Sequence, residues 1–263
     1  EAMMLDKRAL QAGTSHNLGQ NFAKAFDVKF QTEDNNEEYV WATSWGISTR
    51  LIGAVILAHG DKNGLRIPPK IAPIQTVLIP IFRNVEQREL VEKYITSIEI
   101  ELKQLRIRYF IDWSDSSPGF KFNEWELKGV PVRMEIGPRD VESNKLVIAR
   151  RDNSEKLSIS RDEIRDSLKT ILDEIQNNLF NQAKVFRNEN THNVENYNDF
   201  KEIIKQGGFV KCGWDGSQKT ELKIKEETKA TIRCIPFDEK PEGLTCVYSG
   251  ELAKHEVIYA KAY

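Results

Sequence analysis

The chain has 263 residues, of which 40% are hydrophobic and 30% charged, and its formal net charge is −2. This length allows two or three domains with hydrophobic cores and a well-solvated surface. The small net charge gives no global sign of a polyanionic partner, although RNA binding needs only a local basic face. No apolar run approaches the roughly 20 residues of a membrane span, so we expect no membrane partner.

The cysteines and the first residues bear on the compartment. The chain has three cysteines, an odd and widely separated set, which argues against a disulfide scaffold and favours a reducing compartment. The stretch Glu1–Asp6 lacks the basic region and the long apolar segment of a secretory signal. We therefore expect a cytoplasmic protein.

Residues 1–71 are predicted to form part of a domain rather than a whole one. Ser15 can cap a helix that extends to about Phe26, and a strand is predicted near Glu37–Ser44. The segment Ile47–His59 is apolar on most sides, which is typical of a buried helix. Gly60–Gly64 ends this helix, and the two prolines that follow predict an extended linker.

From about residue 72 the pattern changes to alternating strands and helices. Thr76–Ile81 is predicted to be a short buried strand, and Val85–Leu105 has helical spacing with many charges on one side. Further strands are predicted at Arg108–Ile111, Val132–Ile136, Lys145–Ala149 and, as an edge strand, Lys156–Ser160. Such alternation indicates an α/β layer with a mixed or parallel sheet.

A long helix and a small module follow. Ser160 caps the helix with Glu163 at capping-box distance, and the helix is predicted to extend to about Lys184. The polar segment Glu189–Asn198 is predicted to be a linker, and Tyr197–Tyr263 a small α+β module. The predicted domains are therefore residues 1–71, 72–188 and 189–263.

The segment Thr43–Arg50 is the most informative motif in the chain. It places an indole, a glycine and a fixed cation at the start of the apolar helix. The indole offers apolar area to a small ligand, and the Arg50 guanidinium can fork two phosphate oxygens. A charge in an apolar helix needs a partner, because an unpaired buried charge is expensive. The alternative to a bound phosphate is a salt bridge with Glu38 or Asp61.

Three further runs strengthen this motif: Gln11–His16, His59–Gly64 followed by Pro68 and Pro69, and Lys121–Arg133. In this order the four segments closely resemble the prolyl-tRNA synthetase family of the archaeal and eukaryote-like type. The resemblance extends over the whole chain. It implies the C-terminal part of a class II catalytic domain, an α/β anticodon-binding domain with a mixed sheet, and a small α+β C-terminal domain.

The resemblance also implies residues that bind ATP and proline. The implied ATP-binding residues are Gln11, Thr14 and Arg50, with Arg50 as the catalytic group on the triphosphate. The implied proline pocket consists of His16, Ser44, Trp45 and Gly46. The residues alone permit another interpretation, in which Thr14 or Ser15 caps a helix, His16 is a surface residue and Trp45 belongs to a core.

The implied activity is ATP-dependent formation of prolyl-adenylate, followed by transfer of the prolyl group to the 3′ end of tRNA(Pro), with Mg²⁺ as cofactor and a homodimer as the assembly. Positioning and charge neutralisation are expected to dominate such chemistry. The first two class II signatures, which supply the dimer helix, a second arginine and acidic magnesium ligands, are absent from the sequence. We therefore expect the chain to be a C-terminal fragment that is inactive by itself.

The anticodon-binding residues implied by the resemblance are Phe122, Glu126, Arg133, Arg139, Asp140 and, across a variable turn, Lys156. Unstacked anticodon bases are read by stacking and by edge hydrogen bonds, and this set supplies both. The aromatic ring can stack, the carboxylates can accept from guanine N1–H and N2–H, and the arginines can donate to guanine or to phosphate. The alternative is a solvated helix followed by a strand.

The last module resembles the zinc-binding C-terminal domain of the family but departs from its pattern. Cys212 and Cys246 remain, whereas Ser217 and Ser249 replace two thiolates. Serine is a poor zinc ligand, so we expect this degenerate site to bind no zinc. Cys234 is predicted to be a buried strand residue.

The resemblance implies that the C-terminal Tyr263 reaches toward the active site, and the alternative is a frayed strand end. Two other functions are considered for the chain. One is a non-catalytic tRNA-binding accessory module derived from a synthetase, which the missing signatures permit. The other is a nucleotide-binding protein with another substrate, which rests only on Arg50 and its apolar helix.

Overall fold

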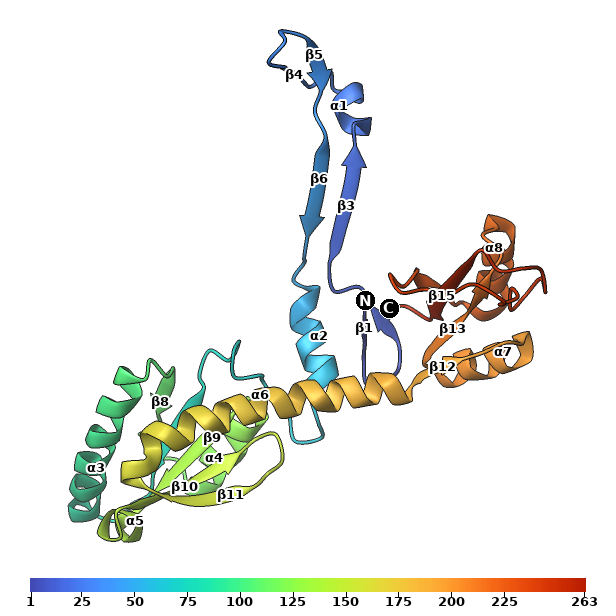
Figure 1. Cartoon of the computed structure of the whole chain (residues 1–263). Coiled ribbons are helices and arrows are strands. Elements are labelled where there is room, and N and C mark those ends of the chain that lie inside the picture. Colours follow the sequence, from blue (N-terminus) through green and yellow to red (C-terminus); the bar gives the residue numbers. More distant parts are fainter. The chain divides into compact units, whose positions relative to one another are not determined.

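The computed structural model describes all residues from Glu1 to Tyr263. It divides into two compact units, one formed by residues 1–54 and 187–263 and the other by residues 55–186. Most of the helices and strands are labelled in Figure 1. None of the helices combines the length and the apolar character needed to cross a membrane.

The unit of residues 55–186 is built on a five-stranded mixed sheet in the order β11-β10-β9-β7-β8. The strands are β7 (Thr76–Pro80), β8 (Tyr109–Ile111), β9 (Val132–Ile136), β10 (Lys145–Arg150) and β11 (Lys156–Ser160). Strand β7 pairs in parallel with β8 and β9, whereas β10 is antiparallel to β9 and β11. The helices are α3 (Val85–Gln104), α4 (Pro118–Leu127), α5 (Pro138–Glu142) and α6 (Ile164–Glu189). The predicted mixed α/β sheet is confirmed.

Strand β7 lies between β9 and β8, and its side chains pack on both faces of the sheet. All of its residues are buried, as in a strand with helices on both sides. Leu78 belongs to the core beneath α3 and α6, whereas Val77 and Ile79 pack with Trp125 of α4 on the other face. Because side chains alternate along a strand, helices α3 and α4 cover opposite faces of the sheet.

The predicted cap at Ser160 begins a short 3-10 helix at Arg161–Glu163, which leads into the amphipathic helix α6. The Ser160 hydroxyl accepts from the Asp162 amide at 3.3 Å, and the Glu163 carboxylate accepts from the Ser160 amide at 3.1 Å. These two bonds form the predicted capping box. The buried positions of the helix fall on one face: Ile164, Leu168, Ile171, Leu172, Ile175 and Leu179.

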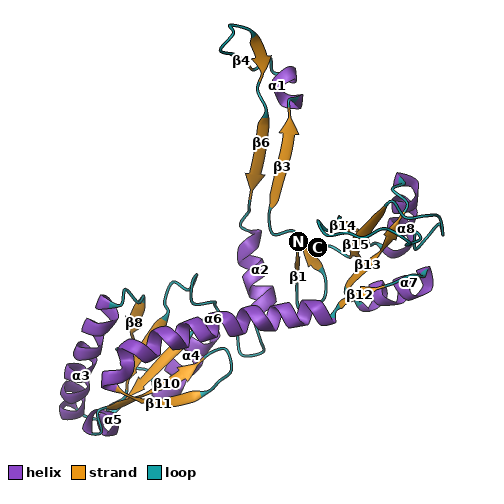
Figure 2. Ribbon diagram, in the orientation of Figure 1, coloured by secondary structure: helices purple, strands orange, loops and turns teal.

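The first residues of the other unit form a long hairpin, in which β3 (Thr14–Gly19) pairs with β6 (Ala42–Gly46), as Figure 2 shows. Helix α1 (Asn21–Ala25) and a second hairpin of β4 (Lys29–Gln31) and β5 (Glu37–Tyr39) follow β3. The helix predicted from Ser15 is therefore wrong, and the single strand predicted at Glu37–Ser44 is two strands. The backbone N–H and C=O groups of β3 form hydrogen bonds with β6 in an antiparallel pair. This pairing outweighs the local preference of Ser15 for a helix N-cap.

Helix α2 (Arg50–His59) confirms the predicted apolar helix, although it starts three residues later than Ile47. None of its residues is buried, and Ile52 is 66% exposed. The prediction of a buried helix is therefore wrong for this chain. An apolar composition indicates that a helix favours packing against another apolar surface, but it does not show that this chain supplies that surface.

The C-terminal module contains a four-stranded sheet in the order β12-β13-β15-β14. Its strands are β12 (Thr191–Asn193), β13 (Phe209–Trp214), β14 (Thr231–Cys234) and β15 (His255–Ala260), and its helices are α7 (Tyr197–Gln206) and α8 (Gln218–Thr228). Phe200 and Tyr259 are fully buried in its core, with ring centroids 5.2 Å apart. A short hairpin of β1 (Ala2–Met3) and β2 (Ala9–Leu10) joins it through a bridge between Ala9 and Ala262.

Two predictions in this module are wrong. The segment Glu189–Asn198 is not only a linker, because β12 within it pairs in parallel with β13. Cys234 lies in a strand as predicted, but it is exposed, because it ends β14 beside a bulge at the outer edge of the sheet. The division at residues 71/72 and 188/189 into three domains stays a prediction.

Candidate functional site

A hollow of about 200 Å³ lies where β9 begins and β10 ends, and we call it the amino-edge hollow. Its lining residues are Trp125, Glu126, Val130, Arg133, Ala149, Arg150, Arg151, Ser154 and Lys156. Three of the predicted anticodon-binding residues, Glu126, Arg133 and Lys156, are among them. Helix α4, strand β9 and strand β11 each supply one of the three, so the fold brings together residues up to 30 positions apart.

Phe122 and Glu135 organise the two cations of this hollow. The Arg133 guanidinium lies 4.4 Å from the Phe122 ring centroid, and the Lys156 ammonium lies 5.5 Å from it. The Glu135 carboxylate accepts from Arg133 Nη2 at 2.9 Å and from Lys156 Nζ at 2.9 Å. Sequence analysis missed Glu135, although its spacing of two from Arg133 on a strand places both on one face.

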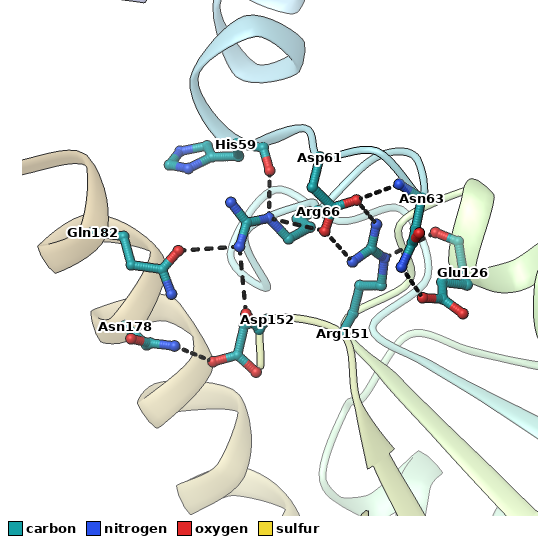
Figure 3. Close-up of polar contacts among 9 residues, drawn as sticks. All are labelled: His59, Asp61, Asn63, Arg66, Glu126, Arg151, Asp152, Asn178 and Gln182. Atoms are coloured by element: carbon teal, nitrogen blue, oxygen red, sulfur yellow. Dashed lines mark hydrogen bonds and ion pairs between the residues drawn. The ribbon is translucent and has the colours of Figure 1, made fainter. Parts of the chain in front are cut away.

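Glu126 is held by the loop that follows α2 (Figure 3). Asn63 Nδ2 donates to Glu126 Oε1 at 3.0 Å, and Arg151 Nε donates to the Glu126 carbonyl at 2.9 Å. No bond within the chain takes Glu126 Oε2, which leaves one carboxylate oxygen for a ligand. The alternative of a solvated helix does not describe Glu126, because its backbone carbonyl and one carboxylate oxygen are held by hydrogen bonds.

The same loop is locked to the sheet by ion pairs. Arg151 donates from Nη1 and Nη2 to the two Asp61 oxygens at 2.8 and 2.6 Å. The hydrogen bonds from Arg151 lower the pKa of Asp61 to about 2. Arg66 donates to the His59 carbonyl at 2.6 Å and to Gln182 Oε1 at 3.0 Å (Figure 3). Asp61 therefore pairs with Arg151 and not with Arg50.

Position 64 in this loop can be occupied only by glycine. Its φ is +129°, and a Cβ there would lie 2.6 Å from the Leu127 backbone. Both the dihedral and the contact exclude a side chain. The loop can therefore approach the end of α4 closely enough for Asn63 to reach Glu126.

The remaining two predicted anticodon-binding residues, Arg139 and Asp140, lie at the other end of β9. They line a second hollow of about 390 Å³, which we call the carboxyl-edge hollow, together with Ile81, Phe82, Arg83, Gln87, Gly137 and Pro138. Asp140 Oδ2 accepts from the Gly137 amide at 2.8 Å and so caps α5. The six predicted residues therefore form two groups at opposite ends of one strand, not one cluster.

The predicted ATP and proline residues meet on the β3–β6 hairpin. Thr14 pairs with Gly46, Ser15 with Trp45 and His16 with Ser44. Gln11 Nε2 donates to Thr14 Oγ1 at 2.6 Å. A shallow hollow of about 300 Å³ is lined by Gln11, Ala12, Gly13, Thr14, Gly46, Ile47, Ser48 and Arg50.

Trp45 does not share this side of the hairpin. Directly paired residues lie on the same face and successive rungs alternate, so His16 and Ser44 lie on the face of Thr14 whereas Trp45 lies on the other. Trp45 is 80% exposed, which also rules out the alternative of a core tryptophan within this chain. The structure thus groups His16 and Ser44 with the ATP candidates and separates Trp45 from them.

Arg50 is exposed, so the argument that its charge is buried is wrong. Its backbone amide donates to Ser48 Oγ at 3.3 Å, and its guanidinium makes no ion pair in the chain. The proposed salt bridges with Glu38 or Asp61 are therefore absent. The guanidinium lies at the rim of the hollow with all of its donors available. No carboxylate lines this hollow, so its residues offer no ligand set for Mg²⁺.

The degenerate zinc position is organised by Asp215. This buried carboxylate accepts from the Ser217 amide at 2.9 Å, from Thr220 Oγ1 at 2.7 Å and from Ser249 Oγ at 2.9 Å. Burial acts to raise the pKa of Asp215, but these hydrogen bonds outweigh it and the pKa is lowered. Burial raises the pKa of Cys212 to about 12, so its thiol stays protonated. Two cysteines with serines at the other two positions do not supply the four Cys or His ligands of a structural zinc site.

Tyr263 is fixed rather than frayed. Its amide donates to the Ala9 carbonyl at 3.2 Å, and its hydroxyl donates to Asp6 Oδ2 at 2.6 Å. The Arg8 guanidinium lies 5.7 Å from its ring centroid. The C-terminal residue is thus anchored to the segment that leads into Gln11.

Comparisons with known proteins identify the domains of the chain. Residues 75–171 match the model of the anticodon binding domain, and residues 197–263 match that of the C-terminal part of prolyl-tRNA synthetase. Across its full length the chain is 51% identical to Proline--tRNA ligase of Bacteroides fragilis and 53% identical to that of Prosthecochloris aestuarii. It spans 54% and 56% of those two proteins.

A solved structure of the same family has a closely similar fold. Prolyl-tRNA synthetase from Cryptosporidium parvum, complexed with halofuginone and AMPPNP, superposes with a TM-score of 0.94 at 38% sequence identity. The match covers 100% of this chain and 55% of that one. The chain belongs to the prolyl-tRNA synthetase family, of which it matches the C-terminal portion.

Proposed function

We propose that the chain is the C-terminal portion of a proline–tRNA ligase that activates proline with ATP and transfers it to the 3′ end of tRNA(Pro). The observation that supports this most is the convergence of Glu126, Arg133 and Lys156 on one hollow, inside the segment that matches an anticodon-binding domain. Identities near 50% to curated proline–tRNA ligases along the whole chain support the substrate.

The amino-edge hollow suits a guanine base. Glu126 Oε2 has no partner in the chain and can accept from guanine N1–H and N2–H. Arg133 can donate to guanine O6 and N7, because Glu135 and the Phe122 ring hold its guanidinium in one place. Lys156 adds a second positive charge at the rim. Base edges give sequence specificity, so this hollow would read the anticodon.

The hairpin hollow would bind the reacting groups. Gln11 and Thr14 would flank adenosine, and the unpaired Arg50 guanidinium would fork the triphosphate oxygens. His16, Ser44 and Gly46 would contact proline, whereas Trp45, on the other face of the hairpin, would not share this contact. Mg²⁺ would be held by residues outside this hollow. Tyr263 would place its carboxylate near the same region.

Two variants of the full-length gene product test the proposal, because each is expected to lose a different activity. Arg50→Ala should lower proline-dependent pyrophosphate exchange about 100- to 1,000-fold, as expected for the loss of a charge-neutralising donor. Arg133→Ala should leave exchange nearly intact but lower charging of tRNA(Pro) by about 1–3 kcal/mol in kcat/KM. Arg165→Ala, which alters an exposed arginine of α6, is the control and should change neither.

Equal loss of exchange and charging in Arg133→Ala would remove the anticodon assignment. Normal exchange in Arg50→Ala would remove Arg50 from the ATP site. Binding of tRNA with no exchange by the unaltered protein would favour the accessory tRNA-binding module instead. The homodimer and the cytoplasmic compartment belong to this proposal as consequences of family membership, and sedimentation of the full-length protein tests the first.

A further inference from the structure

The amino-edge hollow is supported by a residue from outside the segment that matches an anticodon binding domain. Residues 75–171 form that match, and Glu126, Arg133 and Lys156 all lie within it. Asn63 precedes the match and belongs to the loop after α2, yet its Nδ2 donates to Glu126 Oε1 at 3.0 Å (Figure 3). One side chain that would read a base therefore depends on a contact from another part of the chain.

The loop holds Asn63 in one place. Its backbone amide donates to Asp61 Oδ1 at 2.9 Å, and the Asp61 amide donates to the Gly64 carbonyl at 2.9 Å. Asp61 in turn accepts from both Nη atoms of Arg151, whose side chain is buried. A side chain carried on such a turn is positioned in advance, so little entropy is lost when its hydrogen bond forms.

Arg151 fixes the backbone of the same glutamate. Its Nε donates to the Glu126 carbonyl at 2.9 Å, while its Nη atoms donate to Asp61. The loop therefore fixes Glu126 at two points, at Oε1 directly and at the carbonyl through one guanidinium. The terminal torsion of a glutamate side chain is broad, so a bond to one carboxylate oxygen decides where the other oxygen points.

Arg133, the other charged reader of this hollow, does not use the loop. Its Nη2 donates to Glu135 Oε1 at 2.9 Å, and its guanidinium lies 4.4 Å from the Phe122 ring centroid. Both supports lie within residues 75–171. A change at Asn63 should therefore weaken the contact made by Glu126 and leave the contact made by Arg133 as it is.

We propose that Asn63 is a positioning residue for Glu126 and strengthens recognition of the N2–H edge of an anticodon guanine. This inference rests on the proposed function and adds to it a specificity determinant outside the anticodon-binding segment. With Asn63 bonded to Oε1, Oε2 is the acceptor that remains for guanine N1–H and N2–H. Without Asn63 the carboxylate can turn, and the fixed direction of this acceptor is lost.

Guanine analogues separate the two contacts in charging assays with the full-length gene product. Inosine lacks the N2 amino group from which Glu126 would accept, whereas deazaguanine lacks the N7 acceptor to which Arg133 would donate. In the unaltered protein each replacement of an anticodon guanine should lower kcat/KM for charging about 10-fold.

Asn63→Ala should lower kcat/KM with the unmodified tRNA(Pro) by about 2- to 10-fold, the range for one hydrogen bond, and should shrink the inosine penalty by the same factor. The deazaguanine penalty should not change, because the supports of Arg133 are intact. Proline-dependent pyrophosphate exchange, which needs no tRNA, should also stay the same.

Two further variants guard against a general loss of structure. Asn63→Asp places a second carboxylate beside Glu126 and should lower charging at least as much as Asn63→Ala. Gln206→Ala removes another exposed amide-to-carboxylate bond, to Glu202 Oε1, and should change neither penalty. Because Asn63 and Gln206 are exposed, all three variants should unfold at the temperature of the unaltered protein, which differential scanning fluorimetry verifies.

A double-mutant cycle shows whether Asn63 acts through Glu126. Asn63→Ala should cause no further loss in a Glu126→Ala protein, and additive losses would overturn the inference. A full inosine penalty in Asn63→Ala, or a loss of pyrophosphate exchange, would overturn it as well. The proposed function would survive both results, provided that the unaltered protein charges tRNA(Pro) and discriminates against the analogues. Equal charging of every analogue by the unaltered protein would remove the anticodon assignment and this inference together.

Discussion

The five-stranded sheet module and the β3–β6 hairpin region place their apolar side chains differently. In the module, apolar residues of α3, α6 and the strands form one closed core, as at Leu78 and Leu168, which are fully buried. In the hairpin region and the adjoining α2, large apolar side chains are exposed, including Trp45 at 80% and Ile52 at 66% exposure. The module supplies its own partners, whereas the hairpin region and α2 present apolar surface without a partner in this chain.

The comparison teaches that the two regions differ in what stabilises them. Buried Leu and Ile side chains contribute about 1.5–3 kcal/mol each, so the module gains its stability from within. The hairpin region relies on cross-strand hydrogen bonds and local contacts such as that between Gln11 and Thr14.

The largest expected effect is on the free energy of unfolding, compared between a buried leucine of the sheet module and an exposed isoleucine of α2. Leu168→Ala should lower the free energy of unfolding by about 3 kcal/mol, because it leaves a cavity in the closed core. Ile52→Ala should change it by less than about 0.5 kcal/mol, because the side chain is exposed and alanine favours the helix. Urea denaturation followed by tryptophan fluorescence measures both. Similar losses would show that α2 is as well packed as the module.

The second prediction tests whether the C-terminal module, like the sheet module, is stabilised by its own side-chain contacts rather than by a bound metal. Asp215→Ala should destabilise by about 2–3 kcal/mol, because it leaves the Thr220 and Ser249 hydroxyls without their acceptor. Asp238→Ala, at an exposed position with no ion pair, should cost less than about 0.5 kcal/mol. Thermal unfolding with and without a zinc chelator provides the measurement. A chelator-dependent midpoint would show that a metal, not Asp215, organises the module.

A smaller effect concerns the loop that joins α2 to the sheet module. The pKa of Asp61 is lowered from 3.8 to about 2, so its ion pair stabilises the fold above pH 4 and is lost as the pH falls toward 2. Partial exposure weakens the pair, and we expect about 1–2 kcal/mol. Asp61→Asn should remove this part of the acid dependence, which urea midpoints between pH 5 and pH 2.5, roughly the window of acid titration, would reveal. An unchanged acid profile would contradict the assignment.

The smallest effect concerns the anchored C-terminus. Tyr263→Phe removes the hydrogen bond to Asp6 and should cost about 0.5 kcal/mol or less, because the pair is exposed. The ring and its contact with Arg8 remain. Hydrogen exchange at the Ala9 and Tyr263 amides should show slightly faster opening. A loss comparable with that of Leu168→Ala would mean that the first ten residues depend on this one contact.

Sequence patterns predicted the sheet module closely. Val132–Ile136 and Lys156–Ser160 are strands with the predicted bounds, and the capping box of Ser160 and Glu163 is present. Alternation, turn chemistry and capping agree with one another there, and the core lies within the same stretch of sequence. Where a strand pairs with a distant segment, as at Thr14–Gly19 with Ala42–Gly46, local capping gave the wrong element.

The candidate site was predicted less completely. The resemblance named Glu126, Arg133 and Lys156, which the fold brings together, but it did not separate Arg139 and Asp140 at the other strand end. Glu135 and Asn63 were missed, because a supporting ion pair or hydrogen bond depends on side-chain geometry rather than on residue type. Arg50 was judged by its apolar neighbours in sequence, but no residue of α2 is buried in this chain and Arg50 is exposed.

The different surroundings of the cysteines have a practical consequence for spectroscopy. Cys212 and Cys246 are enclosed, and the pKa of Cys212 is raised to about 12, so neither should react readily with a maleimide at neutral pH. Cys234 is the exposed thiol. A fluorophore or spin label can therefore be attached at one defined position of the unaltered chain, without removing the other two sulfhydryls.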